Sequence, residues 1–180
     1  QPVPGVGLQI PVWLLGSSLY SAQLAAQLGL PFAFASHFAP DMLADALTLY
    51  REKFRPSSRL AEPYVIIGVN VIAAESKARA RFLFTSQQQQ FINLRRGMPG
   101  PLPEPVETMD PLWSPAEKYG VERALGMSLV GDQQSVAQGM AALQQQYQAD
   151  EIIVNGQIFD PDSRIYSFSL AMAAAQSLMQ

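Results

Sequence analysis

Gly16, Ser17 and Ser18 stand between a short apolar run and the helical pattern that follows it. In parallel α/β folds, ligands collect at the carboxyl ends of the strands. The first N–H groups of a helix lack internal partners and, together with the helix dipole, favour an anion. Gly16 would let a ligand approach the backbone closely, Ser18 would offer its N–H and hydroxyl, and Ser21 would add a hydroxyl one turn later. These residues predict an anion site, above all for a phosphate.

A purely structural role is also open at the same position, and spacing alone favours it. Ser17 or Ser18 would then cap the helix, and Gly16 would only turn the chain. The stretch is neither a GxGxxG fingerprint nor a P-loop. The spacing therefore leaves an anion site open without establishing it.

Three further polar side chains fall at or near the ends of predicted strands. His37, the single histidine, follows an apolar run and is our candidate for a catalytic side chain, although a structural loop histidine fits as well. Asn70 and Asn155 come late in predicted strands and would reach a ligand or satisfy loop backbone. One histidine without companions at ligand spacing predicts no metal site.

Composition narrows the class of protein. The 180 residues are 48% hydrophobic and 15% charged, which suits one globular domain. A net charge of −3 and the absence of cysteine argue against nucleic acid as a partner and against disulfides, thiolate catalysis or cysteine metal sites. No apolar run approaches the ~18 residues of a membrane span, and no basic-then-apolar signal pattern opens the sequence. We expect a cytoplasmic protein without a membrane partner.

Short apolar runs alternate with helical patterns along the chain. Continuous apolar character is typical of strands covered on both faces, and the segments between them carry helical spacing and cap residues. The predicted strands are residues 12–15, 32–35, 64–72 and 151–155, the last with room to continue to 159; the predicted helices are residues 20–28, 40–54, 75–95, 114–125, 132–147 and the segment that Asp160 and Pro161 open.

Residues 95–110, RRGMPGPLPEPVETMD, interrupt this alternation. Their Pro and Gly content excludes a regular helix or a central strand. Long loops in compact domains are usually functional or mobile, so we predict a mobile loop here.

The alternation itself predicts a parallel sheet with helical crossovers. One architecture is an open doubly wound sheet. The other is part of a (β/α)8 barrel, which typically takes ~250 residues and eight strands. Four predicted strands would make half of such a barrel.

Three segments, in the right order, resemble the luciferase-like flavin monooxygenases, the family of bacterial luciferase. They are PVWLLGSSLYSAQLAAQLGLPFAFASHF, SLVGDQQSVAQGMAAL and ADEIIVNGQIFDPDSRIYSFSLAMA. The resemblance covers nearly the whole chain. It implies a luciferase-like (β/α)8 TIM barrel, of which residues 1–180 form the C-terminal half, about four βα units, beginning just before the fifth barrel strand.

The resemblance also implies a chemistry and a set of site residues. Members bind FMN, reduced by NAD(P)H or by a partner flavin reductase, and insert one atom of O2 into an organic substrate, here an unknown one. The stretch from Gly16 to Ser21 would hold the flavin phosphate, with Ser18 as amide donor and Ser21 as hydroxyl donor. The luciferase subunit has a glutamate at the position of Ser17. Residues 95–110 would correspond to the family's mobile loop.

Two other functions remain compatible with the sequence. The first is a non-catalytic flavin-binding or structural relative of the same barrel, because fold does not decide function. The second is a binding module with an open sheet and no flavin. If the chain is half of a barrel, whether enzyme or non-catalytic relative, its four parallel strands leave two unpaired edges. We therefore expect a homo-oligomer.

Overall fold

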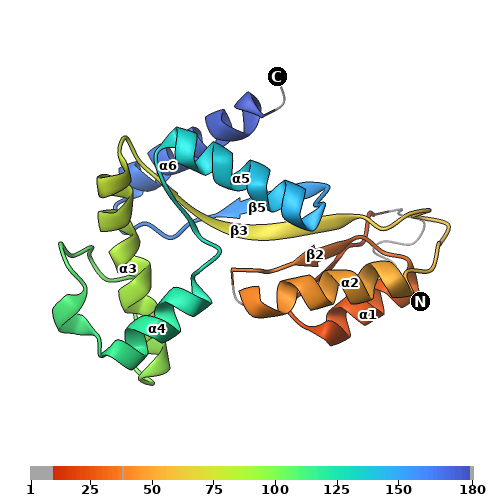
Figure 1. Ribbon diagram of the computed structural model, residues 1–180, viewed down its shortest axis with the longest axis horizontal. Helices are drawn as coiled ribbons and strands as arrows, with labels where there is room; N and C mark the ends of the chain where they lie inside the picture. The colour runs from red at the N-terminus through yellow and green to blue at the C-terminus, as the bar shows by residue number, and fades with distance from the viewer. Residues whose placement is uncertain (1–9, 38, 179–180) are drawn as a thin grey trace, which may run out of the picture.

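A nine-residue strand, β3 (Val65–Ala73), runs through the middle of the fold, and all of its residues are buried. Parallel to it lie β2 (Phe32–Phe34) along its first third, β5 (Glu151–Asn155) along its centre and β4 (Leu129–Gly131) along its last third. β1 (Leu14–Gly16) pairs in parallel with β2. Figure 1 shows this arrangement in the computed structural model, which describes residues 10–37 and 39–178 of the predicted domain.

Helices alternate with these strands. They are α1 (Leu19–Leu28), α2 (Leu43–Lys53), α3 (Lys77–Arg95), α4 (Pro115–Ala124), α5 (Gln133–Tyr147) and α6 (Pro161–Ser177), with short 3-10 helices at Pro40–Met42 and Asp110–Leu112. Local chemistry explains their ends. Ser114 forms a capping box with Glu117, and Gly29 takes the left-handed conformation that ends α1.

The four predicted strands and the predicted helices are confirmed, with ends shifted by a few residues. The sequence patterns did not predict the strand β4. β4 is three residues long and pairs only with the end of β3, so its apolar signal is brief. Asp41 lies in the 3-10 helix at Pro40–Met42, where its type suits a cap, but its carboxylate makes no cap bond and accepts a hydrogen bond from Arg123 at 2.6 Å.

Four helices cover one face of the sheet. Val65, Ile67 and Val69 of β3 share a buried apolar cluster with residues of α1, α2, α5 and α6. In Figure 1, α5 and α6 lie over β3 and β5, while α1 and α2 lie beside β2. Helix α3 packs on the opposite face, where Ile72 of β3 is buried with Ala80 and Leu83.

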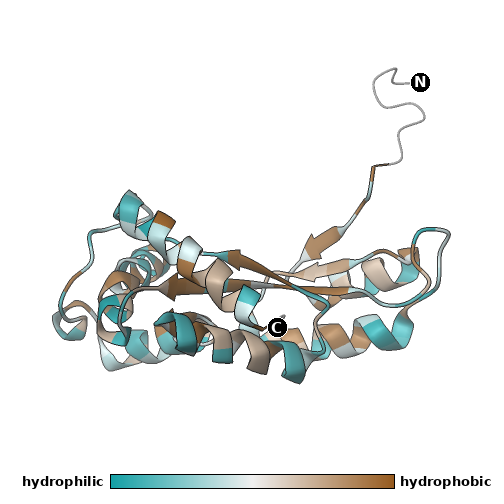
Figure 2. Ribbon diagram, turned by 90° about the horizontal axis from the view of Figure 1, so that it is seen from above, coloured by the Kyte–Doolittle hydropathy of each residue, from teal (hydrophilic) through white to brown (hydrophobic). Residues whose placement is uncertain are grey.

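The other face of the sheet is open toward its edges. Register places Leu15, Ala33 and Ile66 side by side on it, and Gly68 beside Ile153. Leu15 is 69% exposed and Ile153 49% exposed. Figure 2 shows these strands as apolar ribbons through the middle of the fold.

Successive residues of a strand point to opposite faces of the sheet, so only every second residue could line the interior of a barrel. Leu14, Phe34 and Val71 belong to the helix-covered cluster. Their alternating neighbours therefore face the side that a complete barrel would enclose.

The Pro- and Gly-rich segment lies along α3. The N–H of Val106 donates to the Thr85 hydroxyl at 2.9 Å, and the Gln89 amide donates to the carbonyl of Glu104 at 2.8 Å. Met109 is buried against Ile92. The mobility of this loop stays a prediction, and opening of the loop away from α3 would break these contacts. Within the described residues, no helix is both long and apolar enough to cross a bilayer.

We predict that acid weakens the junction of α3 and α4. Arg96 and the N–H of Ser114 donate to the Glu117 carboxylate, each at 2.7 Å, and lower the pKa of Glu117 from 4.5 to about 2. A carboxyl whose pKa is lower in the folded than in the unfolded state stabilises the fold above its unfolded pKa, and this stability is lost as pH falls toward the folded pKa. Glu117→Gln should therefore flatten the loss of stability between about pH 5 and pH 2, measured by urea unfolding.

The control is Glu122→Gln, because Glu122 makes only an exposed contact with Lys118 at 3.9 Å. It should leave the acid profile close to that of the wild type. Identical profiles for Glu117→Gln and the wild type would contradict the assignment.

We also predict self-association of the 180-residue chain. Leu15 and Ile153 are exposed, and among residues 10–37 and 39–178 no further strand pairs with the outer edges of β1 and β5, which leaves apolar surface and unpaired backbone groups. Sedimentation equilibrium of this chain at micromolar concentration should show dimers or larger species, and Leu15→Glu should shift them toward the monomer. A folded wild-type monomer under these conditions would contradict this prediction.

Candidate functional site

The predicted site residues gather at the carboxyl ends of the strands. Gly16 ends β1, His37 follows β2, and Asn155 ends β5. All pairings in the sheet are parallel, so these ends point the same way. This edge is where ligands bind in parallel α/β folds.

Ser18 is the N-cap of α1, so the structural role is confirmed at this position. Its hydroxyl accepts from the N–H of Ser21 at 3.2 Å. The N–H of Ser18 donates to the Ser21 hydroxyl oxygen at 3.2 Å, and that hydroxyl donates to the Ser18 carbonyl at 2.8 Å. The two predicted phosphate donors, the Ser18 N–H and the Ser21 hydroxyl, are thus already engaged in hydrogen bonds between Ser18 and Ser21.

Gly16 makes this close arrangement possible. A Cβ atom at position 16 would overlap the side chain of Ser21. The hydroxyl of Ser21 therefore lies in the space that a side chain on the last residue of β1 would fill. Leu19 and Tyr20 add two N–H groups in the first turn of α1, where a helix provides no internal acceptor.

The N-terminus of α1 also differs from those of three other helices in charge. Asp132 caps α5 and Asp160 caps α6, and hydrogen bonds from Ser135 and from Ser163 lower the pKa of the respective carboxyl. Glu117 plays a similar part in α4. No acidic residue lies in the cap or first turn of α1. An external anion would meet no carboxylate there.

A cavity of about 500 Å³ opens at the same end of the sheet. Its lining includes His37, the amides of Gln87, Gln90 and Asn155, and the ring of Phe91. Pro99 and Gly100 of the Pro- and Gly-rich loop also line it. The structure therefore brings His37, Asn155 and part of the predicted loop together. Gly16, Ser17, Ser18 and Ser21 are not among the lining residues.

His37 forms part of the cavity wall, half-buried against β3. Its Nδ1 lies 3.3 Å from the carbonyl oxygen of Gly68, which also accepts from the Ser36 hydroxyl at 2.6 Å. A Cβ on residue 68 would come within 3.1 Å of His37 Nδ1. The glycine thus lets the imidazole lie directly on the strand.

Gln87 is a polar residue of the cavity that the sequence patterns did not single out. The Asn70 amide, 1% exposed, donates to Gln87 Oε1 at 2.8 Å and to the Ser128 hydroxyl at 2.9 Å. Gln87 opens a run of four glutamines inside the helix predicted at residues 75–95, and such a run is typical of helix-forming sequence. The available signal was a single asparagine inside the apolar run of β3.

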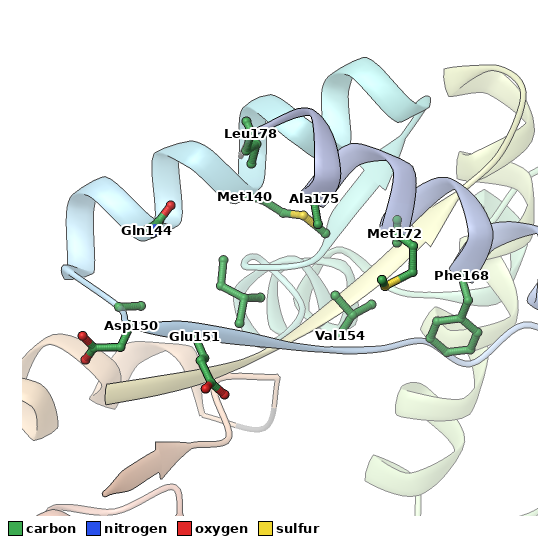
Figure 3. A pocket seen from close by; sticks show the side chains of 12 residues that line it. Met140, Gln144, Asp150, Glu151, Val154, Phe168, Met172, Ala175 and Leu178 are labelled. Atoms are coloured by element: carbon green, nitrogen blue, oxygen red, sulfur yellow. The ribbon is translucent and has the colours of Figure 1, made fainter. Parts of the chain in front are cut away.

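A larger hollow of about 600 Å³ lies between α5, α6 and β5, on the helix side of the sheet. Figure 3 shows Met140, Phe168 and Met172 over β5, with Asp150 and Glu151 at one end. Those two carboxylates stand at the amino end of β5, so the hollow does not open at the carboxyl ends of the strands. We therefore take the smaller cavity as the candidate site.

Comparison with known proteins gives consistent matches. A family model described as luciferase-like monooxygenase matches residues 1–149. A luciferase-like monooxygenase of Escherichia coli is 62% identical over 179 residues, 99% of this chain and 53% of the relative. The uncharacterized protein YvbT of Bacillus subtilis is 47% identical over 168 residues, 93% of this chain and 50% of that protein. The chain spans about half the length of these relatives.

Solved structures agree in fold. The crystal structure of apo-MsnO8 matches with a TM-score of 0.82 at 26% identity, covering 95% of this chain and 53% of that one. Monooxygenase RslO1 from Streptomyces bottropensis matches with a TM-score of 0.55 at 15% identity, over 91% of this chain and 46% of the other, which indicates a shared fold alone.

Proposed function

The chain belongs to the luciferase-like monooxygenase family, and from this premise we propose that the complete protein is an FMN-dependent monooxygenase. Its parallel α/β fold matches the luciferase-like fold, and relatives about twice its length are consistent with half of a barrel. In this proposal the complete protein uses O2 and reduced flavin on a small organic substrate. NAD(P)H or a partner reductase supplies the electrons.

The observation that carries the proposal is the junction of β1 and α1. Gly16 leaves room for the Ser21 hydroxyl at the strand end, and the N-terminus of α1 has no carboxylate of its own. We propose that Gly16, Ser17, Ser18 and Ser21 hold the FMN phosphate there. The Ser21 hydroxyl would exchange its bond to the Ser18 carbonyl for one to a phosphate oxygen, which is the stronger partner because it is charged.

The chain's other contributions are binding and shielding. Bound reduced FMN would supply the chemistry that activates O2. Among the described residues that line the cavity, His37 is the titratable side chain, so we propose it as the group that exchanges a proton with a bound ligand. Pro99 and Gly100 already form part of the wall, and closure of their loop would exclude water from the reaction.

One observation favours a second candidate, a non-catalytic relative of the same barrel family. Ser18 and Ser21 direct their hydroxyls at each other in a complete capping box, as expected of a helix end with a purely structural role. Consumption of NAD(P)H and O2 by the full-length protein with FMN separates the two. Turnover supports the enzyme, and FMN binding without turnover supports the relative.

We predict that Ser21→Ala in the full-length protein weakens FMN binding about tenfold, roughly the 1–2 kcal/mol of one hydrogen bond to a charged group. The matched control is Ser135→Ala. Ser135 occupies the corresponding position of α5, and its hydroxyl donates to the cap residue Asp132 at 2.6 Å. Both variants lose a cap contact, but only the first should change the dissociation constant measured by flavin fluorescence. Equal constants for the two variants would remove Ser21 from the phosphate site.

A further inference from the structure

We infer that Gln87 is a fixed hydrogen-bond donor in the cavity at the strand ends, and that it selects an uncharged ligand carrying a carbonyl oxygen. The inference rests on the proposed function, because it concerns the ligands of the same cavity. Asn70, buried in β3, sets the orientation of Gln87 and is a positioning residue.

The orientation follows from the hydrogen bonds of Asn70. A side-chain amide has two N–H donors. Both are used, one on Gln87 Oε1 at 2.8 Å and one on the Ser128 hydroxyl at 2.9 Å. Because the oxygen of Gln87 is engaged by Asn70, the NH2 end of the same amide is left for the cavity that Gln87 lines.

The buried amide of Asn70 lowers the stability of the fold unless all of its polar atoms are paired. Val69 and Val71 flank Asn70 in the chain, and every residue of β3 is buried. Within the described part of the chain, Asn70 Oδ1 is buried without a hydrogen-bond partner. A buried unpaired acceptor destabilises a fold, and an apolar side chain would avoid that penalty. An amide here is explained by the group that it orients.

The other residues that line the cavity indicate the charge and polarity of the ligand. Apart from His37, the described lining residues are uncharged. Phe91 and buried Leu125 provide apolar surface, and Gln90 and Asn155 provide further amides. An ionised ligand would lack a countercharge from these residues. The volume of about 500 Å³ suits a small organic molecule with an apolar body.

Two sources supply such a carbonyl, the ring of the flavin and the organic substrate. The test uses two probes of nearly equal shape, acetophenone and ethylbenzene, which differ by one carbonyl oxygen. Their dissociation constants are measured by calorimetry on full-length protein without flavin. The wild type should prefer acetophenone about fivefold to tenfold, the range of one neutral hydrogen bond.

Gln87→Met keeps the length of the side chain and removes the donor, so it should abolish this preference. Asn70→Val leaves Gln87 free to turn and should reduce it. The control is Gln145→Met, on an exposed position of α5, which should change nothing. Circular dichroism of each variant checks that it folds.

FMN titration of the same variants distinguishes the two sources. Loss of the probe preference with unchanged FMN affinity assigns the donor to the substrate. A fivefold to tenfold loss of FMN affinity in Gln87→Met assigns it to the flavin carbonyl. If Gln87→Met changes neither quantity, the inference is overturned. A wild type that binds no FMN defeats the proposed function, whereas the probe comparison then still decides the role of Gln87.

Discussion

Backbone hydrogen bonding along both edges of β3 holds the sheet together. β2, β4 and β5 all pair with this one buried strand, and β1 joins through β2. Because every pairing is parallel, the helix that follows β1, the loop that follows β2 and the segment that follows β5 start from the same end of the sheet. Gly16, His37 and Asn155 reach that end from three separate parts of the chain. Helices α1, α2, α5 and α6 pack on the face of Val65, Ile67 and Val69, and α3 packs on the opposite face at Ile72.

The helix N-termini differ in charge, and α1 and α3 each combine a serine cap with a first turn that has no acidic residue. In α4, α5 and α6 the chain places its own carboxylate at the N-terminus. In α1 two serines occupy the equivalent positions, and their hydroxyls are neutral. A phosphate bound by the Ser18 N–H and the Ser21 hydroxyl would replace two neutral hydrogen bonds of the capping box, whereas a carboxylate cap would repel it. The same local chemistry thus serves both helix stability and ligand binding.

Sequence patterns predicted the parts of this structure that depend on local signals. The apolar run of β3 was readable because it is continuous, and the helix predicted at residues 114–125 was readable because its cap residues are closely spaced. The partner of Asp41 was not, since Arg123 lies 82 residues away. The bond from Asn70 to Gln87 likewise requires α3 to fold back onto its strand. At Ser18 and Ser21, sequence located the site, but only the geometry shows that their donors are already engaged.

The central claim is that the N-terminus of α1 binds the phosphate of FMN. Its most direct test is the ratio of the dissociation constants of riboflavin and FMN for the full-length protein, because the two ligands differ only in the phosphate group. Several hydrogen bonds to a dianion should make FMN bind at least about a hundredfold more tightly, and added inorganic phosphate should weaken FMN but not riboflavin. Equal affinities for the two flavins would contradict the account.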